Sequence, residues 1–201
     1  MSELADLYAE IKACKACDLH QRRTQAVPGV GPLDARIMFI GEAPGVNEDK
    51  KGEPFVGNAG QFLNQLLALA GLKREAVYIT NIVKSRPPEN RDPLPQEIAA
   101  CKPWLDRQLE LIKPQVIVTL GRYSMARWFP GASISQIHGT PRKVGPATVI
   151  PMFHPAAALH QPKYKELIEA DFRKLPKILA DLASVKEAEK PKDDPKQLSL
   201  L

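Results

Sequence analysis

The sequence predicts an α/β protein, a three-layer α/β/α sandwich with a central, mainly parallel four-stranded sheet. Four short apolar segments rich in β-branched residues are typical of buried strands, and they lie at residues 35–40, 77–83, 115–120 and 148–153. Stretches with helical apolar spacing separate them, at residues 61–70, 94–112 and 122–129. Strands that alternate with helices in this way form a parallel sheet with helices on both faces.

The segment before the first strand predicts a helix followed by an irregular loop. Residues 4–13 have the spacing of a short amphipathic helix, which runs directly into Cys14 and Cys17. Gly29 and Gly31 then interrupt regular structure. The sheet is therefore expected to begin only after this loop.

The bulk composition indicates one domain and a tail. The chain has 201 residues, 44% of them apolar, which suits a single domain at residues 1–183. From residue 184 to 201 the sequence is polar and charged, so we expect a flexible tail. The net charge of +5 permits binding to nucleic acid. No apolar stretch approaches the roughly 20 residues of a membrane span, and the N-terminus is acidic, so we expect a cytoplasmic monomer without membrane contacts.

The loops that follow the strands are where the sequence predicts a functional site. Open parallel sheets bind ligands beyond the carboxyl ends of their strands. The unusual residues of this chain follow those ends, at GEAPG (41–45), the segment 81–91, Gly121 and HPAAAL (154–159). We therefore expect all four loops to converge on one site.

Three motifs at these strand ends carry a family resemblance. GEAPG with EDKKGEPFVGNAGQFLN (48–64), then TNIVKSRPPENRDPLPQEIAAC (80–101), then HPAAAL occur in this order. They resemble the family 4 uracil-DNA glycosylases, with a match that extends over roughly residues 14–179. The resemblance implies an enzyme that flips deoxyuridine out of single- or double-stranded DNA and hydrolyses its N-glycosidic bond, leaving an abasic site. The alternatives are a module that binds uracil-containing DNA without turnover, and a cluster-bearing nucleotide-binding protein unrelated to repair.

The resemblance assigns the uracil pocket to Gly41, Phe55, Asn81 and His154. Phe55 matches the aromatic residue that stacks on the flipped base. Asn81 matches the base reader, whose amide donates to uracil O4 and accepts from N3–H. His154 matches the histidine that donates a hydrogen bond to uracil O2 as the base departs. The residues alone also permit a core position for Phe55 and a strand-ending turn at Asn81.

Glu42 and His154 are the expected catalytic residues. Glu42 is the carboxylate best suited to orient the attacking water or to stabilise positive charge on the sugar. The next residue, Ala43, stands where better-known members of the superfamily have an aspartate, and alanine cannot activate water. The family 4 enzymes also lack this aspartate. The sequence therefore leaves two roles open for Glu42, water activation and simple orientation of its loop.

Three residues are expected to contact DNA. Leu159 resembles the apolar wedge that fills the gap left by the flipped nucleotide. Arg86 and Arg91 are candidates for phosphate contacts. Core packing of the leucine and ordinary surface charge are the competing explanations.

The cysteines predict a metal site rather than a disulfide. The chain has three cysteines, which cannot all pair, and two of them form a C-x-x-C motif. In family 4, four cysteines hold a [4Fe–4S] cluster, and this chain matches them with Cys14, Cys17, Cys101 and, at the fourth position, Ser85. Serine is a harder ligand that loses its proton reluctantly, so we expect a labile, structural cluster. A three-iron cluster, a bound zinc ion and no metal at all are the alternatives.

The last five residues, QLSLL at 197–201, resemble the short bacterial peptide that docks on the replication sliding clamp. At the end of a charged tether, such a peptide would recruit the enzyme and leave the domain mobile. An ordinary apolar terminus is the alternative.

Overall fold

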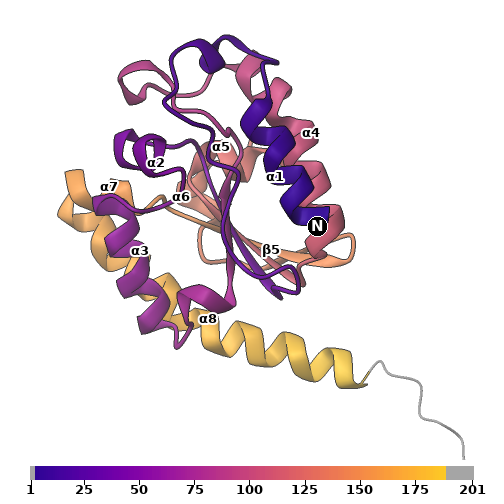
Figure 1. Ribbon diagram of the computed structural model, residues 1–201. Helices are drawn as coiled ribbons and strands as arrows, with labels where there is room; N and C mark the ends of the chain where they lie inside the picture. The colour runs from indigo at the N-terminus through magenta and orange to yellow at the C-terminus, as the bar shows by residue number, and fades with distance from the viewer. Residues whose placement is uncertain (1–2, 189–201) are drawn as a thin grey trace, which may run out of the picture.

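The structure of the chain, a computed structural model, describes residues 3–188 and is built on one central sheet (Figure 1). The strand order is β2-β1-β3-β5-β4. Four strands run parallel and match the four predicted segments, and they are β1 (Ile37–Gly41), β2 (Tyr78–Asn81), β3 (Val116–Leu120) and β5 (Ala147–Met152). The α/β sandwich predicted from the sequence is confirmed.

The sheet has one strand more than the four that the sequence predicts. β4 (Arg142–Val144) pairs antiparallel with β5 at the edge of the sheet. It has three residues, and its two basic side chains are exposed. Such a short, charged edge strand carries no apolar signal, which is why the pattern that marks buried strands does not reveal it.

Helices cover both faces of the sheet. Because successive strand residues point to opposite faces, Phe39 of β1 packs in one core cluster while Met38 and Ile40 pack in another. The helices on the Phe39 side are α3 (Asn58–Leu69) and α8 (Pro162–Ala188). Those on the other side are α4 (Pro95–Ile112) and α5 (Arg122–Ala126), with α1 (Glu3–Ala13) lying against α4.

The remaining described helical elements are short and lie in the connections between the strands and the longer helices. They are α2 (Val46–Lys51), α6 (Ile134–Ile137), α7 (Ala156–His160) and the 3₁₀ turns η1 (Asp18–Gln21), η2 (Arg74–Ala76) and η3 (Pro88–Asn90). Every helix of the described residues is too short or too polar to cross a membrane.

The helix α8 continues past the expected start of the tail at residue 184 and ends at Ala188. One stripe of this helix, formed by Ile168, Phe172 and Leu175, is fully buried against the sheet. Residues 189–201, which include the clamp-like peptide at 197–201, lie outside the described residues.

Candidate functional site

A cavity of about 350 Å³ lies at the carboxyl ends of the parallel strands. It draws residues from the loops after β1, β2 and β5, three of the four loops that the sequence predicts to converge there. Gly121, after β3, is not a lining residue and lies instead behind Glu42. Its lining includes five of the predicted site residues, Glu42, Phe55, Asn81, Arg91 and His154.

Asn81 is the last residue of β2 and pairs with Gly41, the last residue of β1. The Asn81 side chain is only 2% exposed, and its Oδ1 accepts no hydrogen bond from any described residue. An unmet buried acceptor costs about 1–3 kcal/mol, which an N–H group of a ligand would offset. Gly41 leaves room for that ligand, because a Cβ there would lie 2.4 Å from Asn81 Oδ1 and 2.7 Å from the Phe55 ring.

Phe55 forms a wall of the cavity from an unusual backbone conformation. Its φ of 54° lies in the left-handed region, which bulky residues rarely adopt. The ring is 6% exposed, belongs to the main core cluster and stacks on the imidazole of His154. The close turn requires Gly60, since a Cβ there would lie 1.9 Å from the carbonyl oxygen of Phe55. Both sequence interpretations of Phe55, a core residue and a pocket residue, therefore apply.

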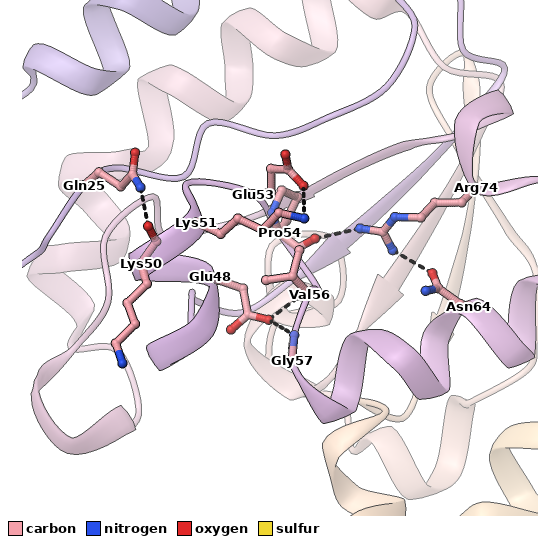
Figure 2. Close-up of polar contacts among 10 residues, drawn as sticks. All are labelled: Gln25, Glu48, Lys50, Lys51, Glu53, Pro54, Val56, Gly57, Asn64 and Arg74. Atoms are coloured by element: carbon pink, nitrogen blue, oxygen red, sulfur yellow. Dashed lines mark hydrogen bonds and ion pairs between the residues drawn. The ribbon is translucent and has the colours of Figure 1, made fainter.

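Two charged side chains hold the loop around Phe55 from its two sides (Figure 2). Arg74 donates a hydrogen bond to the carbonyl of Pro54 at 2.7 Å. Glu48 accepts hydrogen bonds from the N–H groups of the two residues after Phe55, both at 2.8 Å. The strained conformation of Phe55 is thus fixed by contacts on either side of it.

Glu48 also lines the cavity, and the sequence interpretation missed it. Its second carboxylate oxygen accepts the N–H of Gly45 at 3.1 Å, which caps α2. A glutamate three residues after a helix cap is a recognisable capping signal, so the spacing of Gly45 and Glu48 was the available clue.

His154 is held as a neutral ring with one defined donor. Its Nδ1 lies 3.1 Å from the N–H of Ala156 and can only accept there, so the proton of the neutral ring sits on Nε2. Burial, opposed by the nearby Glu48 carboxylate, lowers the pKa of His154 to about 4. The ring therefore donates from Nε2 without carrying a charge at neutral pH.

Glu42 lies between the β1 loop and the turn after β3. Burial raises its pKa to about 7, although the backbone N–H of Tyr123, 3.4 Å from Oε1, acts in the opposite direction. The turn comes so close that a Cβ at Gly121, whose φ is 99°, would lie 2.3 Å from Oε1. The carboxyl group is thus ionised mainly above neutral pH.

The loop between β2 and α4 forms the outer wall of the cavity, and ion pairs hold it in place. Asp92 pairs with Arg122 of α5 at 2.5 Å, and Arg91 makes a two-pronged pair with the buried Glu97, at 2.6 and 2.9 Å. Arg86 donates from Nε to the side chain of Asn90 at 2.7 Å. Of the two predicted phosphate contacts, Arg91 therefore lines the cavity, whereas Arg86 lies in the same loop and is not a lining residue.

Leu159 is on α7, beside the cavity-lining residues Ala156 and His160. Its side chain is 51% exposed. The alternative that Leu159 packs in the core is therefore wrong, and α7 exposes an apolar side chain close in sequence to residues that line the cavity.

The four predicted metal ligands surround one small hollow, separate from the cavity. They come from three segments, because Cys14 and Cys17 follow α1, Ser85 follows β2 and Cys101 lies in α4. Within residues 3–188, no group of three or more His, Cys, Asp or Glu side chains is arranged to hold a single metal ion. The thiols therefore share a hollow without forming a closed mononuclear site.

Hydrogen bonds link the walls of this hollow. The indole N–H of Trp104 donates to Cys14 Sγ at 3.3 Å, and the backbone N–H of Lys84 donates to Cys101 Sγ at 3.4 Å. The guanidinium of Arg23 donates to Ser85 Oγ and to the carbonyl of Cys14, both at 2.9 Å. Arg23 thus joins the end of α1 to the loop after β2.

Comparisons with known proteins match most of the chain. The family model of the uracil DNA glycosylase superfamily matches residues 28–182, which include every loop that lines the cavity. Type-4 uracil-DNA glycosylases of Archaeoglobus fulgidus and Sulfurisphaera tokodaii are each 48% identical to the chain over 87% of its length, and over 92% and 84% of their own. The type-4 uracil-DNA glycosylase of Thermotoga maritima is 49% identical over 78% of the chain and 84% of its own length.

Proposed function

The chain belongs to the uracil DNA glycosylase superfamily and, within it, to the type-4 uracil-DNA glycosylases, and we propose that it removes uracil from DNA. It hydrolyses the N-glycosidic bond of a flipped-out deoxyuridine, releases the free base and leaves an abasic site for base excision repair. The observation that carries this proposal is the buried, unpartnered Oδ1 of Asn81, which faces the same cavity as Phe55 and His154.

Asn81 reads the edge of the base that distinguishes uracil from cytosine. Its Oδ1 accepts the N3–H of uracil and its amide N–H donates to O4. Cytosine has an acceptor at N3 and a donor amino group at C4. The Oδ1 acceptor of Asn81 would then face an acceptor and its N–H donor would face a donor, so neither hydrogen bond could form. The ring of Phe55 supplies the apolar surface for the plane of the base.

His154 stabilises the leaving group. As the N-glycosidic bond breaks, its electron pair moves onto the base and negative charge builds on O2. The Nε2–H of His154, whose position is set by the bond that Nδ1 accepts from Ala156, donates to this oxygen. A donor fixed in advance stabilises the transition state without reorganising when the charge appears.

Glu42 serves the sugar side of the reaction. Its carboxylate stabilises the positive charge that develops at C1′ and accepts a proton from the water that attacks this carbon. The hydroxyl group of that water then completes the abasic sugar. Ala43, which follows Glu42, has no group that can share this task.

The DNA with its nucleotide flipped out is stabilised by Leu159, Arg86 and Arg91. The exposed side chain of Leu159 enters the gap that the nucleotide leaves and offsets part of the lost stacking. The two arginines of the loop between β2 and α4 contact phosphates. Their pairing with Asn90 and Glu97 holds the guanidinium groups in a defined orientation before DNA arrives.

The hollow suits an iron–sulfur cluster ligated by Cys14, Cys17 and Cys101, with a weaker fourth contact at Ser85. Soft thiolates are the preferred ligands of such clusters, and N–H donors already face two of the sulfur atoms. Arg23 occupies the Ser85 oxygen with a hydrogen bond and so disfavours its binding to iron. When bound, the cluster would join three segments of the chain. Its role would be structural, because its hollow shares no lining residue with the cavity.

Cleavage of uracil-containing oligonucleotides tests the proposed function. The full chain is incubated with labelled single- and double-stranded DNA that carries one uracil, and alkali then breaks the strand at any abasic site. Matched strands with cytosine or thymine at that position are the controls. Cleavage confined to uracil is expected. Uracil-dependent retention of intact DNA would instead establish the alternative, a binding module without turnover.

We also propose a monomer that acts in the cytoplasm and is recruited by the sliding clamp. Residues from one chain suffice to form the cavity.

The proposed contact with the sliding clamp rests on the QLSLL sequence at 197–201. A truncation after residue 196 should abolish clamp binding while leaving the rate of uracil release on short oligonucleotides unchanged.

A further inference from the structure

The side chain of Lys84 is buried next to Asn81. It is 2% exposed, and its Nζ makes three hydrogen bonds, to Thr80 Oγ1 at 2.7 Å, to the Asn81 carbonyl at 2.6 Å and to Gln108 Oε1 at 2.6 Å. Lysine is almost never fully buried unless its polar end is satisfied. Three acceptors at these distances match the three N–H donors of the protonated side chain, although burial lowers the pKa of Lys84 to about 7.

The partners of Lys84 are themselves fixed by buried hydrogen bonds. The Gln108 amide donates to the carbonyl of Pro28 and to the hydroxyl of Tyr78, both at 2.8 Å. Thr80 Oγ1 donates to the same Pro28 carbonyl at 2.7 Å. Lys84 Nζ is therefore attached to a rigid network that connects β2, α4 and the loop before β1.

The network ends on the peptide group between Asn81 and Ile82, where the chain leaves β2. The N–H of that peptide belongs to Ile82 and donates to the carbonyl of Gly41 at 3.0 Å. Its C=O belongs to Asn81 and accepts from Lys84. Both polar ends of one peptide are thus held, which fixes the direction in which the Asn81 side chain leaves the backbone.

We propose that Lys84 is a positioning residue for base recognition. Its ammonium group holds the Asn81 carbonyl so that the side-chain amide faces the cavity at the correct angle. This inference rests on the proposed role of Asn81 in reading uracil. Removing the Lys84 donor would leave the Asn81 carbonyl unsatisfied, and the turn would relax toward another partner.

Lys84→Met keeps the unbranched, apolar part of the side chain, one atom shorter than lysine, but removes the donors. Tyr78→Phe is the matched control, because it removes a buried hydrogen bond from the same network at its far end, away from Asn81. Two quantities are measured for each full-length variant, kcat on uracil-containing DNA and the inhibition constant of free uracil. The dissociation constant for uncleaved DNA without uracil, the melting temperature and the metal content are recorded alongside.

We expect Lys84→Met to lower kcat roughly 10- to 100-fold and to weaken inhibition by free uracil, with the affinity for uracil-free DNA unchanged. Tyr78→Phe should lower the melting temperature while keeping kcat and uracil inhibition within about twofold of the original protein. Lys84→Gln, whose shorter side chain still carries an amide donor, should fall between the two.

A Lys84→Met variant that resembles Tyr78→Phe in both kcat and uracil inhibition would overturn the inference. If Lys84→Met does not fold, Lys84→Gln decides by the same comparison. Failure of the proposed function itself is distinct, because the unmodified chain would then leave uracil-containing DNA intact.

Discussion

The imidazole of His154 stacks on the ring of Phe55, with 5.4 Å between centroids and 28° between planes. A base inserted between two rings needs about 7 Å, twice an optimal carbon contact. We therefore expect uracil to lie beside this pair rather than between the two rings. His154 would then meet the edge of the base, where it can donate a hydrogen bond to O2, rather than its face.

Asn81→Ala should lower kcat on uracil-containing DNA by about 100-fold or more, because the variant loses both hydrogen bonds to the base. The affinity for DNA without uracil should change less than about twofold, since phosphate contacts dominate it. Gln65→Ala, which removes an exposed amide from the middle of α3, is the control and should behave like the original protein. Equal kcat values for the two variants would remove Asn81 from the reaction.

The pH dependence of kcat/KM, which reports the groups of the free enzyme, should reveal Glu42 and not His154. Burial raises the pKa of Glu42 to about 7, so kcat/KM should rise with pH through this value as the carboxylate forms. Burial lowers the pKa of His154 to about 4, so this ring is neutral throughout and adds no step near its ordinary value of 6.5. Glu42→Gln should be slower at every pH and lose the step near neutrality. If the change in rate near neutral pH persists in Glu42→Gln, another group is responsible for it.

The same shift predicts that Glu42 destabilises the fold at high pH. The folded protein holds the Glu42 proton up to about pH 7, whereas the ordinary value is 4.5, so the free energy of unfolding falls as pH rises between these values. Glu42→Gln removes this loss and should raise the free energy of unfolding by on the order of 1–3 kcal/mol at about pH 8, with little change at about pH 4. Urea denaturation at the two pH values measures the difference.

The sheet and most of the cavity were predictable because they depend on local signals. Apolar segments marked the parallel strands, and the rule that ligands bind beyond their carboxyl ends located Glu42, Asn81 and His154 together. The roles of these residues came instead from family resemblance. No periodicity indicates that Asn81 Oδ1 lacks a partner, because that depends on the packing of three loops.

Other features depend on tertiary contacts that a single sequence does not display. Lys84 follows a strand and would ordinarily be counted as a surface cation, yet it is buried among acceptors from β2 and α4. The helix α8 buries only a narrow stripe, so its many charged residues obscure the helical pattern. Arg23 likewise gains its importance only once α1 and the Ser85 loop are brought together.

Arg74→Met should lower kcat about 3- to 10-fold by releasing the loop that presents Phe55, because small displacements of a positioning loop reduce the rate. The guanidinium contact with the Pro54 carbonyl is lost, while Glu48 still holds the other side (Figure 2). Arg173→Met removes an exposed arginine that pairs with Glu169 on α8 and is the control. If the two variants keep the same kcat, the loop does not need this anchor.

Ser85→Cys should increase both the iron content and the thermal stability of the purified protein. The substitution supplies a fourth soft ligand at the hollow and removes the oxygen that Arg23 holds. Iron, zinc and acid-labile sulfide per chain, the visible absorbance and the melting temperature are compared with those of the unmodified chain and of Ser85→Ala. Ser85→Ala, which loses the Arg23 contact without gaining a ligand, should melt at a lower temperature than the unmodified chain. An iron content that does not rise in Ser85→Cys would contradict a labile cluster at this site. A stoichiometric zinc ion with no sulfide in the unmodified chain would contradict it as well and would favour the tetrahedral zinc alternative.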